Sequence, residues 1–219
     1  ASSYTSISIS PSGGVPRTIS GNIAGYFIDL NGADNVTIDG LNTGGNSLTI
    51  SNTATGTVST IRFIADASNN TITNCTIQGS VTDGTSGVVK FSTGTVTGND
   101  NNDINHCSIT AAGTNLPIKG IYSEGTSATI DNSNNTLNTN NISDYFNATA
   151  STVGIHLSFN NSSWLITNNK LFQTATRLYT TGAAHYGIYL SGSSYNVTGN
   201  IIGFANSSGT GTTNMVGNS

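Results

Sequence analysis

Charged residues are scarce in this chain. Only 7% of its 219 residues are charged, against about 25% in an ordinary globular protein, and six of them are Lys or Arg. With a formal net charge of -4, so few cations leave no electrostatic footprint for nucleic acid or an anionic membrane surface. No apolar run approaches the roughly 20 residues that span a bilayer. We therefore expect neither a nucleic-acid partner nor membrane insertion.

Cysteine and glutamate are also rare. The two cysteines, Cys75 and Cys107, are too few to form a metal site by themselves. Glycoside hydrolysis needs clustered carboxylates, but Glu124 is the only glutamate and several aspartates lie in turn-like Asn/Ser contexts. The six basic residues are scattered along the sequence, which argues against an acidic-sugar groove. We expect no metal and no cofactor, and catalysis is less favoured than a structural or binding role.

What the chain does contain is one short phrase, repeated six times. An aliphatic residue is followed by Thr or Asn, a variable residue, a small polar residue or Cys, another variable residue, and Ile or Leu. The phrases cover residues 36–41, 72–77, 104–109, 137–142, 166–171 and 197–202. Their period of about 32 residues is typical of a solenoid. We therefore predict a single array over residues 1–219, a fragment or subunit of a longer one.

A second element precedes each phrase and has the two-residue alternation of a half-buried strand. These elements are Ile28–Leu30, Ile61–Phe63, Val89–Phe91, Ile121–Ser123, Ile155–Leu157 and Ile188–Leu190. Clusters of Gly, Asn and Asp between the elements indicate tight turns. One such unit cannot bury its apolar side alone, so the units must stack. The sequence predicts an all-β fold, a single-stranded parallel β-helix of about six to seven coils.

The fourth position of the phrase predicts a column of stacked side chains at a bend. Its members are Asp39, Cys75, Cys107, Asn140, Asn169 and Asn200. Amide side chains stacked in this way form a hydrogen-bonded ladder. Equivalent positions on adjacent coils would place the two cysteines within the Cα distance that a disulfide permits. Two stacked thiols are slightly favoured over a bond, because free Cys is a good buried filler.

These phrases resemble the PbH1-type repeats of right-handed parallel β-helix proteins. Over about residues 25–207 the chain is similar to the Asn/Thr-rich repeats of large secreted or surface proteins of environmental bacteria, particularly Bacteroidetes. The resemblance implies a right-handed solenoid outside the cell or at its surface. It does not decide the activity, because lyases, hydrolases, adhesins and fibre proteins share this fold.

The middle residues of the second element should form a row on the outside of the solenoid. The row reads Asp29, Arg62, Lys90, Tyr122, His156 and Tyr189. Tyr122, His156 and Tyr189 suit a carbohydrate-binding or carbohydrate-cleaving face, since Tyr rings provide stacking platforms for sugars. The alternative is an ordinary solvent-facing strand, which is favoured because no second row of residues converges on the first.

A further outward column suggests a third function. It contains Thr37, Thr73, Asn105, Asn138, Thr167 and Thr198. Regular Thr rows occur in ice-binding proteins, although Asn interrupts this one, and cross-strand pairing of small polar groups explains it equally. Taken together, the sequence favours a structural or adhesive solenoid that self-associates as a stalk, matrix component or filament. Polysaccharide binding or cleavage is the main alternative, and ice binding is a more remote one.

Overall fold

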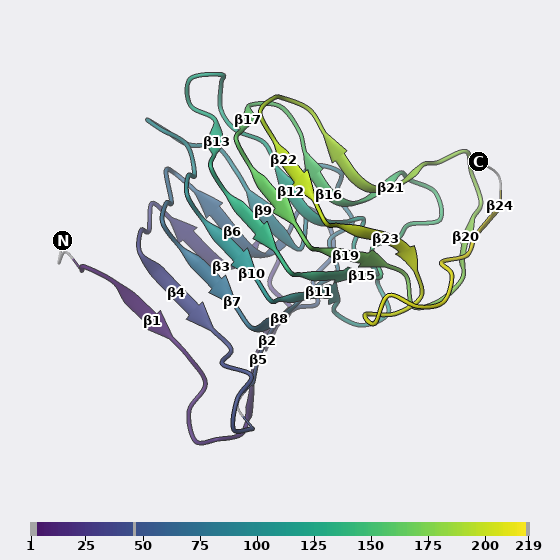
Figure 1. Cartoon of the computed structure of the whole chain (residues 1–219), viewed down its shortest axis with the longest axis horizontal. Coiled ribbons are helices and arrows are strands. Elements are labelled where there is room, and N and C mark those ends of the chain that lie inside the picture. The colour runs from purple at the N-terminus through teal and green to yellow at the C-terminus, as the bar shows by residue number, and fades with distance from the viewer. Residues whose placement is uncertain (1–3, 46, 218–219) are drawn as a thin grey trace.

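The computed structural model describes residues 4–45 and 47–217; the predicted domain 1–219 also includes residues 1–3, 46 and 218–219, which lie outside the described residues. The chain is a parallel β-solenoid of about six turns (Figure 1), as the sequence predicted. No helix occurs among the described residues, so none of them forms a helix that could cross a membrane.

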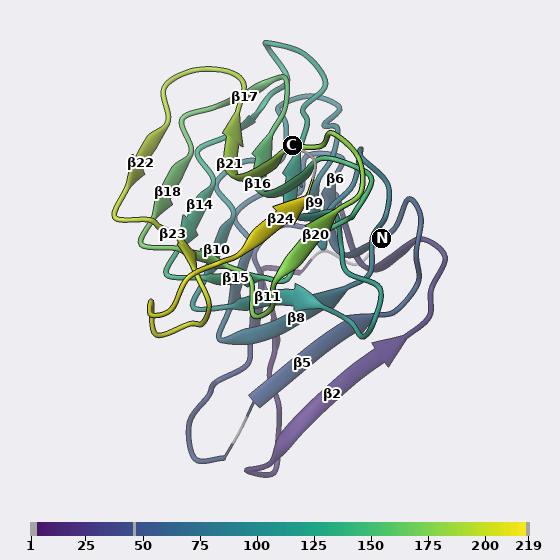
Figure 2. The same ribbon diagram turned by 90° about the vertical axis from the view of Figure 1, so that its right-hand side faces the viewer.

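Three stacked parallel sheets enclose the core on three sides (Figure 2). Sheet A contains β1 (Ile7–Ile9), β4 (Val36–Asp39), β7 (Thr71–Thr73), β10 (Asp103–Asn105), β14 (Thr136–Asn138), β18 (Leu165–Thr167) and β22 (Asn196–Thr198). Sheet B contains β2 (Pro16–Gly21), β5 (Ser47–Asn52), β8 (Cys75–Gly79), β11 (Ser108–Ala111), β15 (Asn141–Ser143), β19 (Lys170–Phe172) and β23 (Ile201–Phe204). Sheet C contains β3 (Tyr26–Asn31), β6 (Ser59–Ile64), β9 (Val89–Phe91), β12 (Lys119–Ser123), β16 (Thr152–Leu157) and β21 (His185–Leu190).

Two small parallel sheets lie outside this stack. β13 (Asn132–Ser133) pairs with β17 (Asn161–Ser162) at the corner between sheets C and A. β20 (Arg177–Tyr179) pairs with β24 (Met215–Gly217) beside the last coils (Figure 1). The connections vary in length at all three corners of the coil. Between sheets A and B, for example, seven residues separate β4 from β5, but two separate β10 from β11.

The phrase residues are stacked in sheet A, with one shift in register. Ile72 pairs with Ile104 on the next coil, and the stack continues through the later phrases. On the preceding coil, however, Ile38 rather than Val36 pairs with Ile72, so the first phrase was aligned two residues too early. Val36 and Ile38 both point inward and are buried. Because side chains alternate with a period of two, the apolar pattern alone fits either register.

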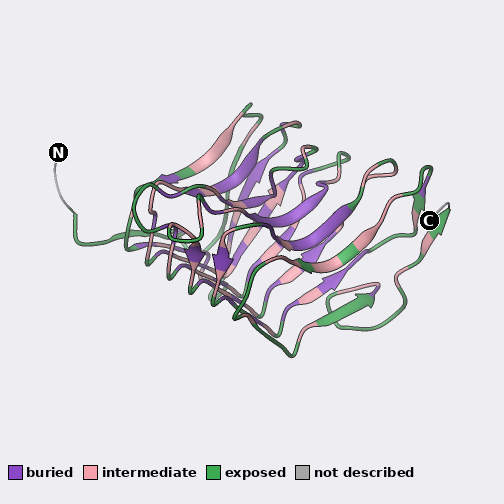
Figure 3. Cartoon of the chain, turned by 90° about the horizontal axis from the view of Figure 1, so that it is seen from above, coloured by how far each residue is buried: buried purple, intermediate pink, exposed green. Residues whose placement is uncertain are grey.

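The interior is a continuous column of aliphatic and aromatic side chains. The Phe63 and Phe91 rings stack with their centroids 4.3 Å apart, and Trp164 meets Phe91 edge-on at 4.8 Å. Each fully buried side chain of this size contributes about 1.5–3 kcal/mol of transfer free energy. Buried residues gather along the middle of the stack, whereas the outermost coils expose apolar residues such as Ile9 and Ile202 (Figure 3).

The sharp corner between sheets A and B depends on one residue per coil with positive φ. Asn74, His106, Thr139, Asn168 and Gly199 occupy this place, with φ between 52° and 69°. Asn and Gly tolerate this left-handed conformation, whereas a β-branched residue such as Thr139 is strained in it. The bend turns the next side chain inward, where it belongs to the predicted ladder.

Candidate functional site

The predicted outer row of sheet C is in register across six coils. Asp29 pairs with Arg62, Arg62 with Lys90, and Lys90 with Tyr122. Tyr122 then pairs with His156, and His156 with Tyr189. Neighbouring members are therefore about 4.8 Å apart along the solenoid axis.

Aromatic and cationic side chains touch one another along this face. The Arg62 guanidinium lies 3.5 Å from the centre of the Tyr26 ring, and the Lys119 ammonium lies 4.3 Å from that of Tyr122. The Tyr122 and His156 rings meet edge-on at 5.3 Å, as do those of His156 and Tyr189 at 5.0 Å. Tyr186 extends the series, with its centroid 5.1 Å from that of Tyr189.

A second row, which was not expected, lies three residues before the first. It includes Lys119, Val153 and Tyr186, which pair in register. The two residues between the rows are Gly-Ile in three successive coils, and the Ile residues at positions 121, 155 and 188 belong to the core or pack against it. A Cβ on Gly120 would lie 2.6 Å from Ile142 of sheet B, so this position requires glycine. The repeated Gly-Ile pair, which directly precedes Tyr122, His156 and Tyr189, is the signal that could have revealed the second row.

The two rows and two loops enclose a pocket of about 310 Å³, which we call the sheet C pocket. Its lining residues are Gly84, Lys119, Ser151, Val153, His156, Tyr186 and Tyr189. Gly84 and Ser151 come from loops at the corner between sheets B and C. Tyr186 and Tyr189 are 40% and 43% exposed, so two aromatic rings are open to solvent at this site.

Tyr122 differs from its expected role as an exposed platform. It is only 4% exposed, and its hydroxyl donates a hydrogen bond to Glu124. Burial, helped by Glu124, raises the Tyr122 pKa well above its usual range. The buried Tyr122 ring therefore packs against the Lys119 ammonium. Tyr186 and Tyr189 are the rings available to a ligand.

Lys119 and His156 are both shifted by burial. Lys119 is 6% exposed, its ammonium donates to the Gly84 carbonyl, and burial lowers its pKa to about 8. Burial, assisted by the charge of Lys119, lowers the pKa of His156 to about 4. At neutral pH the pocket thus holds a charged ammonium beside a neutral imidazole.

Three of the six basic residues of the chain converge on this face, contrary to the scattering expected from the sequence. Asp29 neutralises Arg62 through two hydrogen bonds of 2.7 and 2.8 Å. Lys90 is half-buried, and its pKa is lowered mainly by burial and to a lesser extent by the nearby Arg62 charge. The lining of the pocket contains no carboxylate, and so no pair of the kind that glycoside hydrolases use. Its chemistry is that of stacking, hydrogen bonding and one cation.

The predicted ladder occupies the corner between sheets A and B. The Asn140 side-chain amide donates to the Asn169 side-chain oxygen at 3.0 Å, and Asn169 donates to Asn200 at 3.0 Å. The Cys107 backbone N–H donates to the Asn140 side chain at 3.0 Å. Asp39 lies outside this column because it pairs with Thr73, a consequence of the register shift in the first phrase.

Cys75 and Cys107 continue the ladder column as buried, unbridged thiols. Burial raises the pKa of the Cys107 thiol, and the two groups interact with each other. No group of three or more His, Cys, Asp or Glu side chains within residues 4–45 and 47–217 is placed to hold a metal ion.

A further asparagine ladder was not predicted. Asn70 donates to the side-chain oxygen of Asn102 at 3.0 Å, and Asn102 donates to that of Asn135 at 3.1 Å. All three are buried at the corner before sheet A. The signal in the sequence is an Asn two residues before the aliphatic residue that starts the phrase, at Ile72, Ile104 and Leu137.

The Thr/Asn column considered for ice binding is largely engaged within the protein. Thr73 is hydrogen-bonded to Asn105, and Thr167 donates to Asn138 at 3.0 Å. Thr37 lies outside the column, since it pairs with Thr71. Hydroxyl groups bonded across the strands match the cross-strand pairing that was the alternative explanation of this column.

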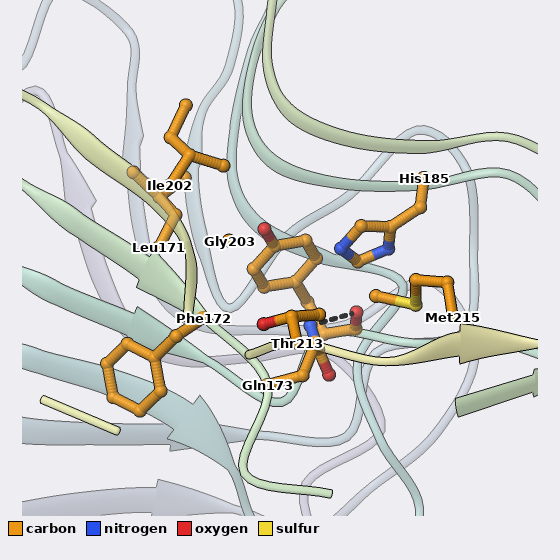
Figure 4. A pocket seen from close by; sticks show the side chains of 9 residues that line it. Leu171, Phe172, Gln173, His185, Ile202, Gly203, Thr213 and Met215 are labelled. Carbon is orange, nitrogen blue, oxygen red and sulfur yellow. Dashed lines mark hydrogen bonds between the residues drawn. The ribbon is translucent and has the colours of Figure 1, made fainter. Parts of the chain in front are cut away.

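A cavity of about 210 Å³ lies at the C-terminal end of the core (Figure 4). Leu171 and Ile202 line one side, and the Tyr145 and His185 rings, stacked at 4.9 Å, line another. The His185 Nδ1 is hydrogen-bonded to the Thr152 hydroxyl at 2.8 Å, and burial lowers the His185 pKa to about 4. Because Leu171 and Ile202 are inward-facing residues of successive coils, this cavity continues the core and is not a separate site.

Comparisons with protein-family models, with curated proteins and with solved structures gave no match to this chain.

Proposed function

We propose that the chain is part of an extracellular adhesive solenoid that holds a polysaccharide along the outer face of sheet C. The observation that carries this proposal is the pair of exposed rings, Tyr186 and Tyr189, beside a pocket that opens onto a row of aromatic and cationic side chains. The sequence alone favours assembly over glycan binding, because charge is scarce, catalytic residues do not cluster, and a single outward row is visible on this face.

The chemistry of the pocket suits a sugar. Tyr rings offer an apolar face to the C–H groups of a pyranose together with a polar hydroxyl edge. Sugar hydroxyls can bond to the Lys119 ammonium, the Ser151 hydroxyl and the Gly84 backbone, all of which line the pocket. Concave sites with aromatic walls and a few polar groups are typical of ligand-binding pockets.

The row also suits a polymer rather than a single sugar. Six coils at about 4.8 Å per coil give a face about 24 Å long. A polysaccharide lying along the solenoid axis could contact several coils at once, and many weak contacts along one chain raise the overall affinity.

The repeat type, the handedness of the solenoid and the kind of parent protein are further parts of this proposal. We propose that the repeats are of the PbH1 type, that the solenoid is right-handed, and that it comes from a large secreted or surface protein of Bacteroidetes-like bacteria. The Asn/Thr-rich phrases and the Gly-Ile spacers before the outer row support this assignment. An experimentally determined structure would test the handedness directly.

Glycan retention by surface variants tests the proposed function. Tyr186→Ala and Tyr189→Ala should each weaken retention in affinity electrophoresis through polysaccharide gels by about tenfold, and the double variant should abolish it. Tyr4→Ala is the matched control, since Tyr4 is 47% exposed and lies outside the face. If the three face variants migrate like the unaltered chain and the Tyr4→Ala control in every gel, glycan binding by this face is wrong. Reducing-end assays on the same mixtures would detect cleavage, which we do not expect.

Self-association is the second candidate function. The outermost coils leave inward-facing residues uncovered, including Ile9 at one end and Val197 and Ile202 at the other. A second copy of the chain stacked end to end would bury these residues and pair the open strand edges. Sedimentation velocity over a concentration series should then show growing rods, visible as filaments by negative-stain microscopy, and Ile202→Lys should suppress them. A constant monomer mass for the unaltered chain would contradict assembly.

A further inference from the structure

We propose that the sheet C pocket recognises an anionic sugar unit, with the Lys119 ammonium binding its carboxylate or sulfate group. This inference rests on the proposed glycan-binding function and names its ligand class. It departs from the sequence-based expectation that the basic residues are too scattered for an acidic glycan.

The first support is that Lys119 is buried without a carboxylate partner. An ammonium group has three N–H donors, and Lys119 uses one on the Gly84 carbonyl. Among the described residues the ion pairs are Arg62 with Asp29 and Arg177 with Asp144, and neither includes Lys119. Removing a charge from water is costly unless a counter-charge or hydrogen bonds replace the lost hydration. An anionic ligand would supply that counter-charge.

The second support is that the nearby acidic side chains are already engaged. Asp83 accepts hydrogen bonds from Thr57 at 2.8 Å and from Thr85. Glu124 accepts the hydroxyl proton of Tyr122. Neither carboxylate lines the pocket. The charged side chain that an anion would contact between Tyr186 and Tyr189 is therefore that of Lys119.

The third support is a second cation close by. Lys90 and Lys119 approach the same Tyr122 ring, at 6.0 and 4.3 Å from its centre. Lys90 is half-buried and takes part in neither ion pair of the described chain. Two cations on adjacent coils match successive anionic units of a polymer that runs along the axis.

Matched pairs of ligands test the inference. Oligouronates would be compared with the carboxyl-reduced oligosaccharides made from them, and sulfated oligosaccharides with their desulfated forms, by isothermal titration calorimetry. A charged hydrogen bond predicts about tenfold tighter binding of the anionic member of a pair. The pair that shows the preference identifies carboxylate or sulfate as the recognised group.

Variants separate this inference from the proposed function. Lys119→Met keeps the apolar stem and should remove the preference for the anionic member, whereas Tyr189→Ala should weaken both members. Lys170→Met, on sheet B, is the control for loss of one positive charge. If the anionic and neutral members bind equally tightly, both to the unaltered chain and to Lys119→Met, recognition of an anionic sugar is overturned but glycan binding stands. No binding of any oligosaccharide would overturn both.

A pH series needs no Lys119 variant and covers the case in which Lys119→Met does not fold. Because the Lys119 pKa is about 8, the preference for the anionic member should hold at pH 7 and decline above pH 8. The titratable groups around Lys119 are Lys90, Asp83, Glu124, Tyr122 and His156. Asp83, whose pKa is lowered, is ionised and His156 is neutral throughout this range, and the Tyr122 pKa lies above it. The Lys90 pKa is also lowered by burial, so the pH series is repeated in Lys90→Met to isolate Lys119. A preference that stays constant to pH 10 would exclude Lys119 as the anion-binding group.

Discussion

Asn140 and Asn169 are joined by two hydrogen bonds to a single oxygen. Both the side-chain amide and the backbone N–H of Asn140 donate to the Asn169 side-chain oxygen, each at 3.0 Å. The Asn169 amide in turn donates to the Leu137 carbonyl at 2.8 Å. One amide side chain therefore satisfies backbone groups at a bend that would otherwise be buried without partners.

Asn169→Ala is expected to be strongly destabilising. It leaves the Asn140 N–H and the Leu137 carbonyl buried without their partner, and each such group costs about 1–3 kcal/mol. We expect the free energy of unfolding to fall by about 2–5 kcal/mol in urea denaturation. Asn196→Ala, at an exposed position on β22, should change it by less than about 0.5 kcal/mol. Equal effects of the two substitutions would contradict the structural role of the ladder.

Stability should fall in mildly acidic solution because of His185. Its pKa is lowered from 6.5 to about 4, chiefly by burial and also by the Arg177 charge, so the folded state favours the neutral ring. The stabilisation is complete above pH 6.5 and is lost as pH falls toward 4, with a magnitude on the order of 3 kcal/mol. Thermal melting in His185→Gln should show a shallower pH dependence in this window. Some pH dependence of the melting temperature should remain in this variant, because the His156 pKa is lowered to a similar value.

Asp66 should hold the loop of residues 95–98 in place. Its carboxylate accepts hydrogen bonds from the backbone N–H groups of Thr95, Val96, Thr97 and Gly98, at 2.8–3.1 Å. Burial acts to raise its pKa, but these bonds and the Thr95 hydroxyl outweigh it and the pKa is lowered. In Asp66→Ala, hydrogen exchange of these four amides should accelerate while the core strands keep their protection.

The control for Asp66 is Asp34, which accepts from a single backbone N–H, that of Ser68, at 2.8 Å. Asp34→Ala should accelerate exchange near residue 68 and leave residues 95–98 unchanged. If the loop exchanges at the same rate with and without the Asp66 carboxylate, its order has another origin.

The thiols of Cys75 and Cys107 should resist modification in the folded protein. Both thiols are buried, so reagents have little access to them. Alkylating reagents react with the thiolate, and burial of Cys107 disfavours that form by raising its pKa. Labelling with a maleimide should be absent in buffer and should reach two groups per chain in denaturant. Rapid labelling of the native chain would contradict the burial, whereas no labelling in denaturant would indicate a disulfide.

The stacked fold could be predicted from the sequence because the apolar phrase recurs with a nearly constant period. The register of the first coil could not, since Val36 and Ile38 are both apolar and both point inward. Asp39 was assigned to the ladder for that reason, although it pairs with Thr73. Period-two patterns determine which face is buried but leave shifts of two residues undecided.

The outer row was predictable residue by residue, but its exposure was not. Tyr122 and Tyr189 occupy equivalent positions, yet the Tyr122 hydroxyl is bonded to Glu124 and its ring lies against Lys119, whereas Tyr189 is open. Tyr189 lies on β21, an edge strand of sheet C, whereas Tyr122 lies on β12 between Lys90 and His156 of the neighbouring coils. Lys119 belongs to the second row, and the only sequence signal for that row is the Gly-Ile pair that follows its members in three coils.

Each residue of the outer row belongs to a different coil, about 32 positions from the next in sequence. Duplicating or deleting one whole coil would therefore lengthen or shorten the face by one residue, about 4.8 Å, without altering the contacts within the other coils. The length of the proposed polymer-binding face and the number of repeats encoded in the gene are thus coupled, so that a longer face can arise through unequal recombination between repeats.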